Sequence, residues 1–475
     1  MVDLAPDLGV GGGHLVFDGV DLVELARRVG TPFYVFSPAR VEANVRSLVR
    51  AFTSRHADTE IFFASKACSN LWFLGEVLRA GINVEVNSGG ELAKAGRAGF
   101  APEQIVFNGV AKSRDEIRAA LRAGVRGLTV DSLFELERIA AEATTLGCRA
   151  PVDLRVDVHV PTLTHPGLVT AHGGKFGIDR DDALAAFAFA RDHDALDPRG
   201  LHVHVGSQIT GLEPYRDAVE RALDLIDEIE AAGLRLERLN AGGGFAVPYR
   251  EQSVCEPVDY FCAPLTIDEY AEAICEPLEA RRPELKLLLE PGRFVAGNTA
   301  LLVTSVENEK TKGRRDETGR RVGDERWLTI DAGFNTLLEH TNYHWYYRTI
   351  VASRADEAAD TPFRLAGPLC DGGDVFVGDD DTPYRTFPAA TAPGDVIVFL
   401  DAGAYGLEQM HPYNARPRAA AYAVHDGKLS QIRLADTFED MIASDVTPAL
   451  PLPRESLAQS LGGQAARTGE GPGGA

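Results

Sequence analysis

The stretch Ile61-Phe62-Phe63-Ala64-Ser65-Lys66 is an apolar run that ends in a lysine. Consecutive apolar residues without alternation are typical of a strand buried on both faces, as the strands of parallel sheets are. A lysine at the end of such a strand has its ammonium group held close to the core. Burial lowers the pKa of an amine, which favours Schiff-base chemistry. The alternative is that Lys66 only extends its charged end into solvent.

Comparable apolar strands alternate with amphipathic helices from about residue 38 to residue 295. The predicted strands are short: Ile61–Ala64, Gln104–Phe107, Gly127–Val130, Val152–Val156, Gly200–Val205, Glu237–Asn240 and Leu285–Leu289. One predicted helix, Tyr215 to Ala231, carries Val219, Leu223 and Ile226 on a single face. Roughly eight strand–helix units favour a closed (β/α)8 barrel over a doubly wound sheet. No GxGxxG turn opens a helix, which also argues against a dinucleotide-binding fold.

The chain changes character after residue 295, where helical patterns become rare. Ala300–Glu307, Arg326–Ile330, Asp395–Leu400 and Ala419–Val424 are predicted strands, and the charged segment Gly313–Asp324 is a predicted exposed hairpin loop. These patterns divide the chain into a flexible N-terminus (1–13), a segment joining the β-domain (14–37), the barrel (38–295), the β-domain (296–455) and a disordered tail (456–475).

Composition limits the classes of partner and compartment. The 475-residue chain is 45% hydrophobic and 25% charged, as is usual for globular proteins. Its formal net charge of −22 disfavours nucleic acid and anionic membranes as partners. Six scattered cysteines show neither a disulfide framework nor metal-ligand spacing, so reduced thiols and no metal site are expected. No secretory signal or membrane-spanning run is evident, and a cytoplasmic location is expected.

Two polar clusters follow predicted barrel strands, where barrel enzymes gather their functional side chains. In Leu201-His202-Val203-His204-Val205-Gly206-Ser207-Gln208, His204 can stack on a flat ring and Ser207 can donate a hydrogen bond to phosphate. In Asn240-Ala241-Gly242-Gly243-Gly244, the backbone N–H groups of the glycines can cradle phosphate oxygens. The alternatives are buried structural histidines and a simple turn.

The stretch Leu287-Leu288-Leu289-Glu290-Pro291-Gly292-Arg293 places two opposite charges after another strand. A carboxylate at the end of a buried strand needs a partner, and a protonated pyridine nitrogen would provide one. Arg293 can contact phosphate or a carboxylate. The alternative is an internal ion pair between Glu290 and Arg293.

The β-domain adds Gly367-Pro368-Leu369-Cys370-Asp371-Gly372-Gly373-Asp374 and, later, Asp401-Ala402-Gly403-Ala404-Tyr405. In this order and spacing, the motifs resemble those of the fold-type III pyridoxal-phosphate (PLP) decarboxylases, a family that includes diaminopimelate, ornithine and arginine decarboxylases. The resemblance covers roughly residues 14–445. It implies an alanine-racemase-like TIM barrel, with a C-terminal β-barrel or sandwich domain that includes the N-terminal strands.

The resemblance assigns a role to each motif. Lys66 would bond covalently to PLP, His204 would stack on its ring, and Glu290 would keep the pyridine nitrogen protonated. Glu85 and Glu91 match the family's acidic positions near the Schiff base. The remaining expected cofactor contacts hold the phosphate: Ser207, Gly242, Gly243, Gly244, Arg293 and Tyr405.

The resemblance also implies a homodimer with active sites shared across its interface. Cys370 of the second subunit would protonate the substrate Cα after CO2 leaves. Glu339 stands where the family's diaminopimelate enzymes carry an arginine for the distal carboxylate, and an acid there would attract a distal ammonium instead. Asp371 matches the aspartate with which ornithine decarboxylases bind the distal amine. Tyr343 and His344 complete the expected substrate pocket.

A diaminopimelate-like barrel combined with Cys370-Asp371-Gly372 most resembles bacterial D-ornithine/D-lysine decarboxylases. The expected reaction therefore converts D-ornithine or D-lysine to putrescine or cadaverine and CO2, a step of polyamine biosynthesis. The alternatives are decarboxylation of meso-diaminopimelate to L-lysine and decarboxylation of a specialised biosynthetic intermediate. A racemase with the same barrel fold is disfavoured because Cys370-Asp371 does not match the racemase pattern. A non-catalytic regulator is disfavoured because Lys66, Glu290 and Cys370 are all present.

Overall fold

The structure is a computed structural model that describes residues 6–162, 164–170, 173–250, 260–378 and 382–445. The chain forms two compact units. The first ends at Ala435, and the second begins at Asp436 and includes the short helix α13 (Phe438–Ile442). All further description concerns the first unit.

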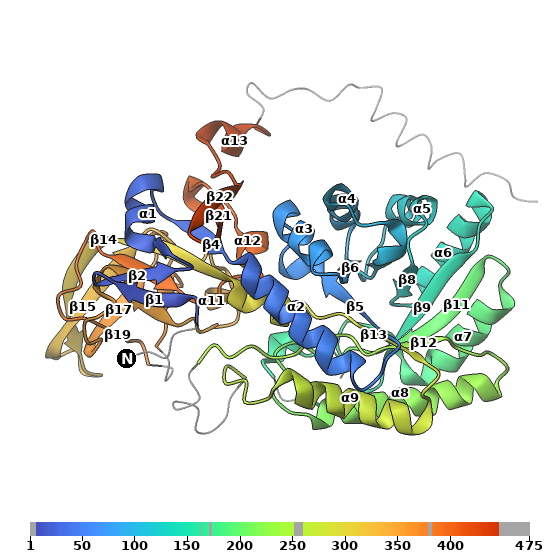
Figure 1. Ribbon diagram of the computed structural model, residues 1–475. Helices are drawn as coiled ribbons and strands as arrows, with labels where there is room; N and C mark the ends of the chain where they lie inside the picture. The colour runs from blue at the N-terminus through green and yellow to red at the C-terminus, as the bar shows by residue number, and fades with distance from the viewer. Residues whose placement is uncertain (1–5, 163, 171–172, 251–259, 379–381, 446–475) are drawn as a thin grey trace, which may run out of the picture. The chain divides into compact units, whose positions relative to one another are not determined.

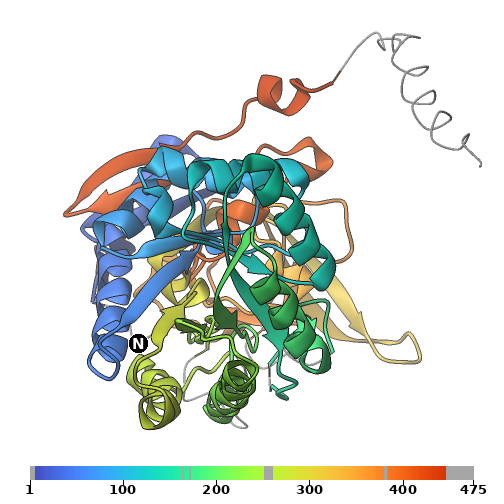
Figure 2. The same ribbon diagram turned by 90° about the vertical axis from the view of Figure 1, so that its right-hand side faces the viewer.

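Eight parallel strands of the first unit close into a barrel, because β8 pairs with β9 and β13 pairs with β5. The ring is seen in Figure 2. Its strands, in ring order, are β5 (Thr59–Ala64), β6 (Asn83–Val86), β7 (Ile105–Phe107), β8 (Gly127–Val130), β9 (Ala150–Asp157), β11 (Leu196–His202), β12 (Arg238–Asn240) and β13 (Lys286–Leu289). Two-residue β10 (Ile178–Asp179) extends the sheet beside β9. The predicted fold class is confirmed.

Helices cover the outside of the barrel (Figure 1). They are α2 (Pro38–Thr53), α3 (Leu71–Arg79), α4 (Gly89–Ala98), α5 (Arg114–Ala123), α6 (Leu133–Leu146), α7 (Ala183–Asp192), α8 (Glu213–Ala231) and α9 (Ile267–Arg281). Their ends follow local chemistry: α5 starts at a capping box between Ser113 and Glu116 and ends at Gly124 in the left-handed conformation. Apolar faces such as Val41, Val45 and Leu48 of α2 are buried against the barrel.

The β-domain is built on the long hairpin of β14 (Ala300–Arg315) and β15 (Arg321–Ile330). Strand β4 (Phe33–Phe36) lies between β14 and β21 (Ala420–His425), so an N-terminal strand belongs to this sheet as expected. The other strands are β16 (Thr349–Val351), β17 (Thr361–Ala366), β18 (Val375–Phe376), β19 (Arg385–Phe387), β20 (Val396–Phe399) and β22 (Lys428–Arg433). One face packs with helix α1 (Leu22–Val29) in a second apolar cluster.

Several predicted boundaries differ from the structure. Leu8–Gly11, within the segment predicted to be flexible, is a strand (β1) that pairs with β2 (His14–Phe17), whose Leu15 and Phe17 are fully buried; β3 (Val20–Asp21) completes this small sheet. The predicted loop Gly313–Asp324 is mostly strand, with only residues 316–320 in the turn. The last strand of the β-domain ends at Arg433, before the predicted limit of 455. The predicted disordered tail lies outside the described residues.

Two other expectations concern cysteines and membranes. Cys68, Cys148, Cys275 and Cys370 are free, but Cys262 is disulfide-bonded, which differs from the expected set of reduced thiols. Among the described residues, no helix is both long and apolar enough to cross a membrane.

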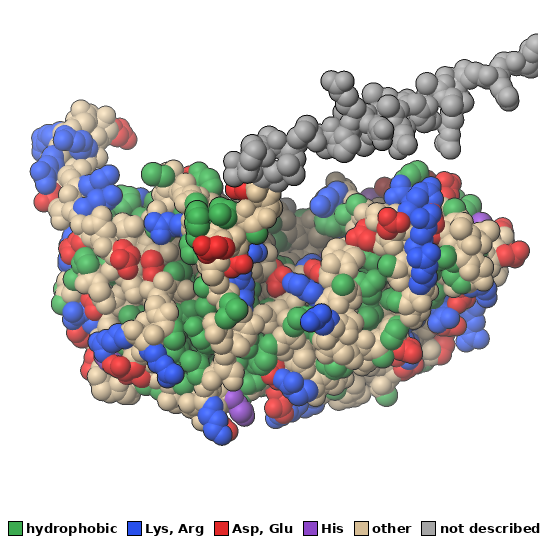
Figure 3. All heavy atoms as spheres, turned by 90° about the horizontal axis from the view of Figure 1, so that it is seen from above, with side chains coloured by type: hydrophobic (Ala, Val, Ile, Leu, Met, Phe, Trp, Pro, Cys, Tyr) green, Lys and Arg blue, Asp and Glu red, His purple; other side chains and the backbone are tan. Residues whose placement is uncertain are grey.

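On the face drawn in Figure 3, acidic and basic side chains are interspersed.

Candidate active site

Lys66 directly follows β5 in a short 3-10 turn, Ser65–Ala67. Its two neighbours are buried while Lys66 itself is exposed at the C-terminal end of the barrel, where barrel enzymes place their sites. Although part of the Lys66 side chain is exposed, desolvation by the surrounding protein would by itself lower the pKa of Lys66; Glu85, Tyr405 and Glu290 outweigh this effect and raise the pKa. The expected lowering is therefore wrong for the protein without cofactor, because acidic groups surround the amine.

Glu85 and Glu91 lie beside Lys66. Glu85, on β6, is fully buried, and burial raises the pKa of its carboxyl to about 8, although Lys66 opposes the shift. Asn87 donates to Glu85 Oε2 at 3.1 Å, while Glu85 Oε1 is buried with no hydrogen-bond partner. Glu91 accepts from Ser65 Oγ at 2.8 Å and from the Asn87 N–H at 2.7 Å. Glu91 thus fixes the residue that precedes Lys66.

Glu290, which follows β13, is also a buried acid, but its pKa is shifted in the opposite direction from that of Glu85. Asn240 donates to Glu290 Oε1 at 2.7 Å, and His202 Nε2 and Asn108 Nδ2 lie 3.1 and 3.3 Å from Oε2. Burial raises the pKa of Glu290, but His202 and Lys66 outweigh it and lower the value to about 2. Glu290 is therefore ionised, and its partner is His202 rather than Arg293.

His202, Asn240 and Asn108 were not among the sequence-predicted site residues. Each stands at or just after the C-terminal end of a barrel strand, and each is almost completely buried. A polar side chain in that position was the available signal, because buried polar groups need partners.

His204 and the glycines of residues 242–244 pack against one another. A Cβ on Gly242 would lie 2.4 Å from His204 Nδ1, and one on Gly243 would lie 2.3 Å from the backbone oxygen of Glu290. Only glycine allows this approach. Two of the three N–H groups already donate, from Gly242 to Asn240 and from Gly243 to His204. Ser207, half-buried, lies beyond Gly206 in the same region.

Arg293 and Glu339 form a buried ion pair, each being 3% exposed. Arg293 Nη1 and Nη2 donate to the two carboxylate oxygens at 3.0 and 2.9 Å. Arg293 Nη1 also donates to the Tyr249 hydroxyl, and Tyr347 donates to Glu339. The sequence predicted separate phosphate and substrate roles for Arg293 and Glu339; the structure pairs them, joining α10 (Arg293–Ala296) after the barrel to α11 (Glu339–Asn342) of the β-domain.

Tyr405 is held against the Lys66 segment. Its N–H donates to Ala67 O at 2.7 Å, and its backbone adopts φ 62°, which is unusual for a tyrosine. Glu408, on α12 (Gly406–Gln409), accepts from the Ser69 N–H and Oγ, both at 2.7 Å. Arg293 lies 4.7 Å from the Tyr405 ring centroid, so Tyr405 links the ion pair with Lys66.

The predicted substrate residues fall into two places. Tyr343 contacts His165 of a barrel loop, with ring centroids 5.3 Å apart, and the adjacent His344 is exposed with φ 50°. Cys370 and Asp371 lie on the exposed loop between β17 and β18. Within the described residues, their hydrogen bonds go to Asn414, Gly373 and Asp374, not to the groups around Lys66.

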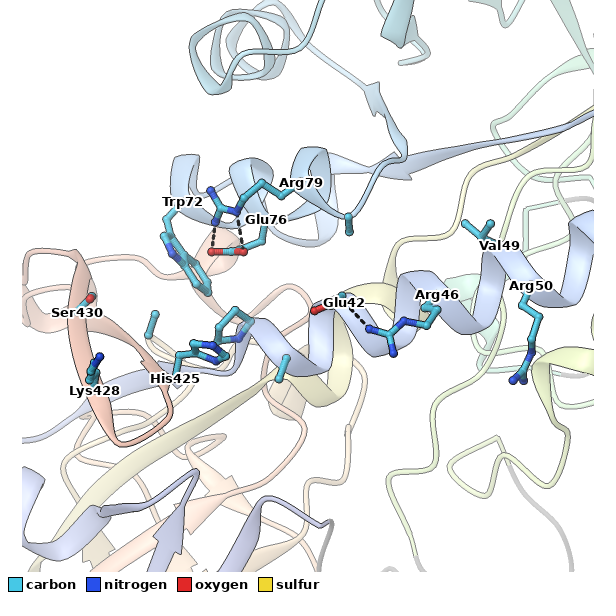
Figure 4. A pocket seen from close by; sticks show the side chains of 14 residues that line it. Glu42, Arg46, Val49, Arg50, Trp72, Glu76, Arg79, His425, Lys428 and Ser430 are labelled. Atoms are coloured by element: carbon cyan, nitrogen blue, oxygen red, sulfur yellow. Dashed lines mark hydrogen bonds and ion pairs between the residues drawn. The ribbon is translucent and has the colours of Figure 1, made fainter.

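A separate surface cavity of about 840 Å³ lies among α2, α3 and the β21–β22 hairpin. Figure 4 shows that Trp72 and His425 reach into it and that Glu42–Arg46 and Glu76–Arg79 are paired on its walls. None of its lining residues belongs to the Lys66 surroundings, so this cavity is not the reaction site.

The groups around Lys66 fit PLP. An amine, an ionised carboxylate and a histidine lie at one end of the barrel, matching the aldehyde, the pyridine nitrogen and the ring face of the cofactor. The buried Glu85 oxygen without a hydrogen-bond partner is a polar atom that a bound cofactor or substrate could satisfy.

Comparison with known proteins identifies the class. Residues 39–297 match the family described as "Pyridoxal-dependent decarboxylase, pyridoxal binding domain", and the chain belongs to this family. It is a PLP-dependent carboxy-lyase with a cofactor-binding barrel and a C-terminal β-domain.

Three relatives with high similarity to this chain are decarboxylases of one kind. The chain is 36% identical to diaminopimelate decarboxylase of Pseudomonas aeruginosa over 434 residues, covering 91% of this chain and 97% of the relative. It is 34% identical to diaminopimelate decarboxylase of Archaeoglobus fulgidus, covering 92% and 98%. The crystal structure of the M. jannaschii diaminopimelate decarboxylase with L-lysine superposes with TM-score 0.81 at 29% identity, covering 93% and 98%.

Proposed function

We propose that this enzyme decarboxylates a diamino acid, and that meso-diaminopimelate, which would give L-lysine, is the foremost candidate substrate. Relatives that match nearly their whole length to this chain are named diaminopimelate decarboxylase, which supports this substrate over D-ornithine or D-lysine. The observation that carries the reaction type is the ionised Glu290 beside Lys66 at the C-terminal end of the barrel.

The side chains have distinct proposed roles. Lys66 would bind PLP covalently and release it to the incoming amine. Glu290 would hold a proton on the pyridine nitrogen, since its carboxylate stays charged. Bound PLP supplies a conjugated ring that accepts the electron pair left when CO2 departs. His204 would pack on the ring. The proposed phosphate contacts are Ser207, Gly242, Gly243, Gly244, Arg293 and Tyr405.

Cys370 is the proposed proton donor to the substrate Cα. Its exposed loop is available to a second copy of the chain, which supports a homodimer with active sites shared between subunits. Asp371, one residue along, would then face the substrate's distal end, together with Tyr343 and His344.

A second candidate substrate is D-ornithine or D-lysine, and one observation favours it. The positive charge of Arg293 is already neutralised by Glu339 at 2.9 Å. A distal carboxylate entering here would find Arg293 already paired with Glu339, whereas a distal ammonium could be bound by the exposed Asp371.

The test measures CO2 release by the PLP-loaded protein from meso-diaminopimelate, D-ornithine, D-lysine and the two L-forms. Turnover of diaminopimelate alone supports the foremost candidate, and turnover of D-ornithine or D-lysine alone supports the second. No CO2 release from any of the five amino acids would indicate a specialised intermediate as the substrate.

The variant Glu339→Gln sharpens the comparison of substrates. Removing this anion makes the charge of the site more positive, so the ratio of kcat/KM for diaminopimelate to that for D-ornithine should rise. Glu24→Gln, at an exposed ion pair on α1, is the control and should leave the ratio unchanged. A ratio that stays constant in Glu339→Gln would remove Glu339 from the substrate-selecting residues.

A further inference from the structure

We propose that Asp374 is a positioning residue that fixes the Cys370 loop to the segment carrying Glu339. The inference rests on the proposed function, because it concerns two groups assigned there to proton transfer and substrate choice. Among the described residues, the carboxylate of Asp374 makes no hydrogen bond to Lys66 or to a proposed site residue.

The carboxylate of Asp374 bridges two loops. It is 2% exposed and accepts from the Phe334 N–H at 2.9 Å through Oδ1 and from the Leu369 N–H at 2.9 Å through Oδ2. His340 Nε2 lies 3.5 Å from Oδ1. One oxygen therefore holds each loop, and a buried charge makes such hydrogen bonds stronger than neutral ones.

Two glycines make room for this carboxylate. A Cβ on Gly333 would lie 2.4 Å from Asp374 Oδ2, and one on Gly367 would lie 2.2 Å from it. Gly367 also donates its N–H to the backbone oxygen of Asp374 at 2.9 Å. The glycines of Asp331-Ala332-Gly333 and Ala366-Gly367-Pro368 thus share one structural reason, which is the close packing of two backbones on one side chain.

The contacts lead from this carboxylate to both groups. On one side, Leu369 precedes Cys370, and the Asp374 N–H donates to Asp371 O at 3.3 Å. On the other side, Phe334 and His340 flank the segment that ends in α11, where Glu339 binds Arg293. Loss of the bridge should let the thiol move relative to Glu339 without disturbing the barrel.

The experiment compares Asp374→Asn with Asp360→Asn, an exposed aspartate just before β17. An asparagine amide has one acceptor oxygen, so one of the two backbone N–H groups would face an N–H2 group instead. Hydrogen exchange is measured by mass spectrometry on the PLP-loaded full chain. Exchange in peptides covering 333–340 and 367–374 should quicken about tenfold in one or both, while β20 (Val396–Phe399) stays protected.

Activity and absorbance complete the test. In Asp374→Asn, kcat should fall about tenfold while the absorbance of protein-bound PLP stays unchanged, because the Lys66 surroundings are intact. Gly333→Ala should reproduce both changes, since its Cβ displaces the same carboxylate. Exchange no faster than in Asp360→Asn overturns the proposal. Exchange that quickens equally in β20 overturns it too, because Asp374 would then stabilise the whole domain.

The exchange measurement needs no substrate, which separates this inference from the proposed function. Loosened loops in a protein that turns over none of the five amino acids would uphold the bridge and defeat the substrate assignment. Unchanged exchange in these loops, in an enzyme that turns over one of the amino acids, would overturn the bridge and uphold the substrate assignment.

Discussion

Around Lys66, the acidic side chains Glu85 and Glu290 are buried at the ends of β6 and β13, the two strands that flank β5, whereas Cys370 and Asp371 lie exposed on a loop of the β-domain. In the first region, burial and neighbouring charges shift pKa values in opposite directions for two chemically identical acids. In the second region, geometry depends on a few hydrogen bonds to backbone groups. Buried strands can therefore tune proton affinity, while an exposed loop can be presented to another molecule.

The largest expected effect comes from Lys66→Ala. Decarboxylation should fall by at least about 10⁴-fold, as for loss of a covalently acting group, and the absorbance of bound PLP should disappear. Lys310→Ala, on the exposed β14–β15 hairpin, is the control and should keep both. Substantial activity in Lys66→Ala would mean that Lys66 is a structural lysine.

The next effect concerns the ion pair between Arg293 and Glu339, which joins the barrel to the β-domain. Glu339→Ala leaves the Arg293 guanidinium buried without its counter-charge and should lower the free energy of unfolding by about 3–5 kcal/mol. The double variant Arg293→Met/Glu339→Leu should recover much of that loss. Denaturant unfolding measures both, with the exposed Glu24→Ala expected to change stability by less than about 1 kcal/mol. A small loss in Glu339→Ala would show that water reaches Arg293.

Cys370→Ala should act on the rate and leave the barrel untouched. Loss of this proposed proton donor should cost about 10²-fold in kcat, while absorbance of bound PLP and thermal stability should stay the same. Cys148→Ala, at a free and half-buried cysteine, is the matched control. Full activity in Cys370→Ala would assign the proton to another group, and altered absorbance would place the loop inside the Lys66 region.

The most gradual effect is a pH dependence of stability that distinguishes Glu85 from Glu290 in the PLP-free protein. The carboxyl of Glu85 has a pKa of about 8 in the folded state and about 4.3 unfolded. Between these values the folded state holds an extra proton, so stability falls as pH rises, by at most about 1.4 kcal/mol per pH unit. Glu85→Gln should remove this slope.

Glu290→Gln provides the contrast. With a folded pKa of about 2, Glu290 contributes stability that is fully present above the unfolded pKa and lost only as pH falls toward 2. The stability of Glu290→Gln should therefore still fall with rising pH from about pH 5, but the fall should end at a lower pH than in wild type, because the charge of Glu290 helps to raise the pKa of Glu85. Equal slopes in wild type and Glu85→Gln would contradict the raised pKa of Glu85.

The sequence predicts the barrel well and misses what depends on distant contacts. The run Ile61–Ala64 is a strand because apolar residues on both faces leave little alternative, and the predicted helix Tyr215 to Ala231 lies within α8 (Glu213–Ala231). Strand β6 was missed because Glu85 interrupts its apolar pattern. The pairing of Arg293 with Glu339 is also invisible in sequence, since only the packing of the β-domain on the barrel brings them together.

The position of β4 has a consequence for synthesis on the ribosome. This strand is made before the whole barrel, yet its two neighbours in the sheet, β14 and β21, are made after it. The barrel can close while β4 still lacks both of its partner strands. The β-domain stays incomplete until β14 and β21 have been synthesised. Chains truncated before β21 should therefore expose the unpaired edge of an apolar strand. The C-terminal strands are then needed to avoid aggregation as well as to complete the site.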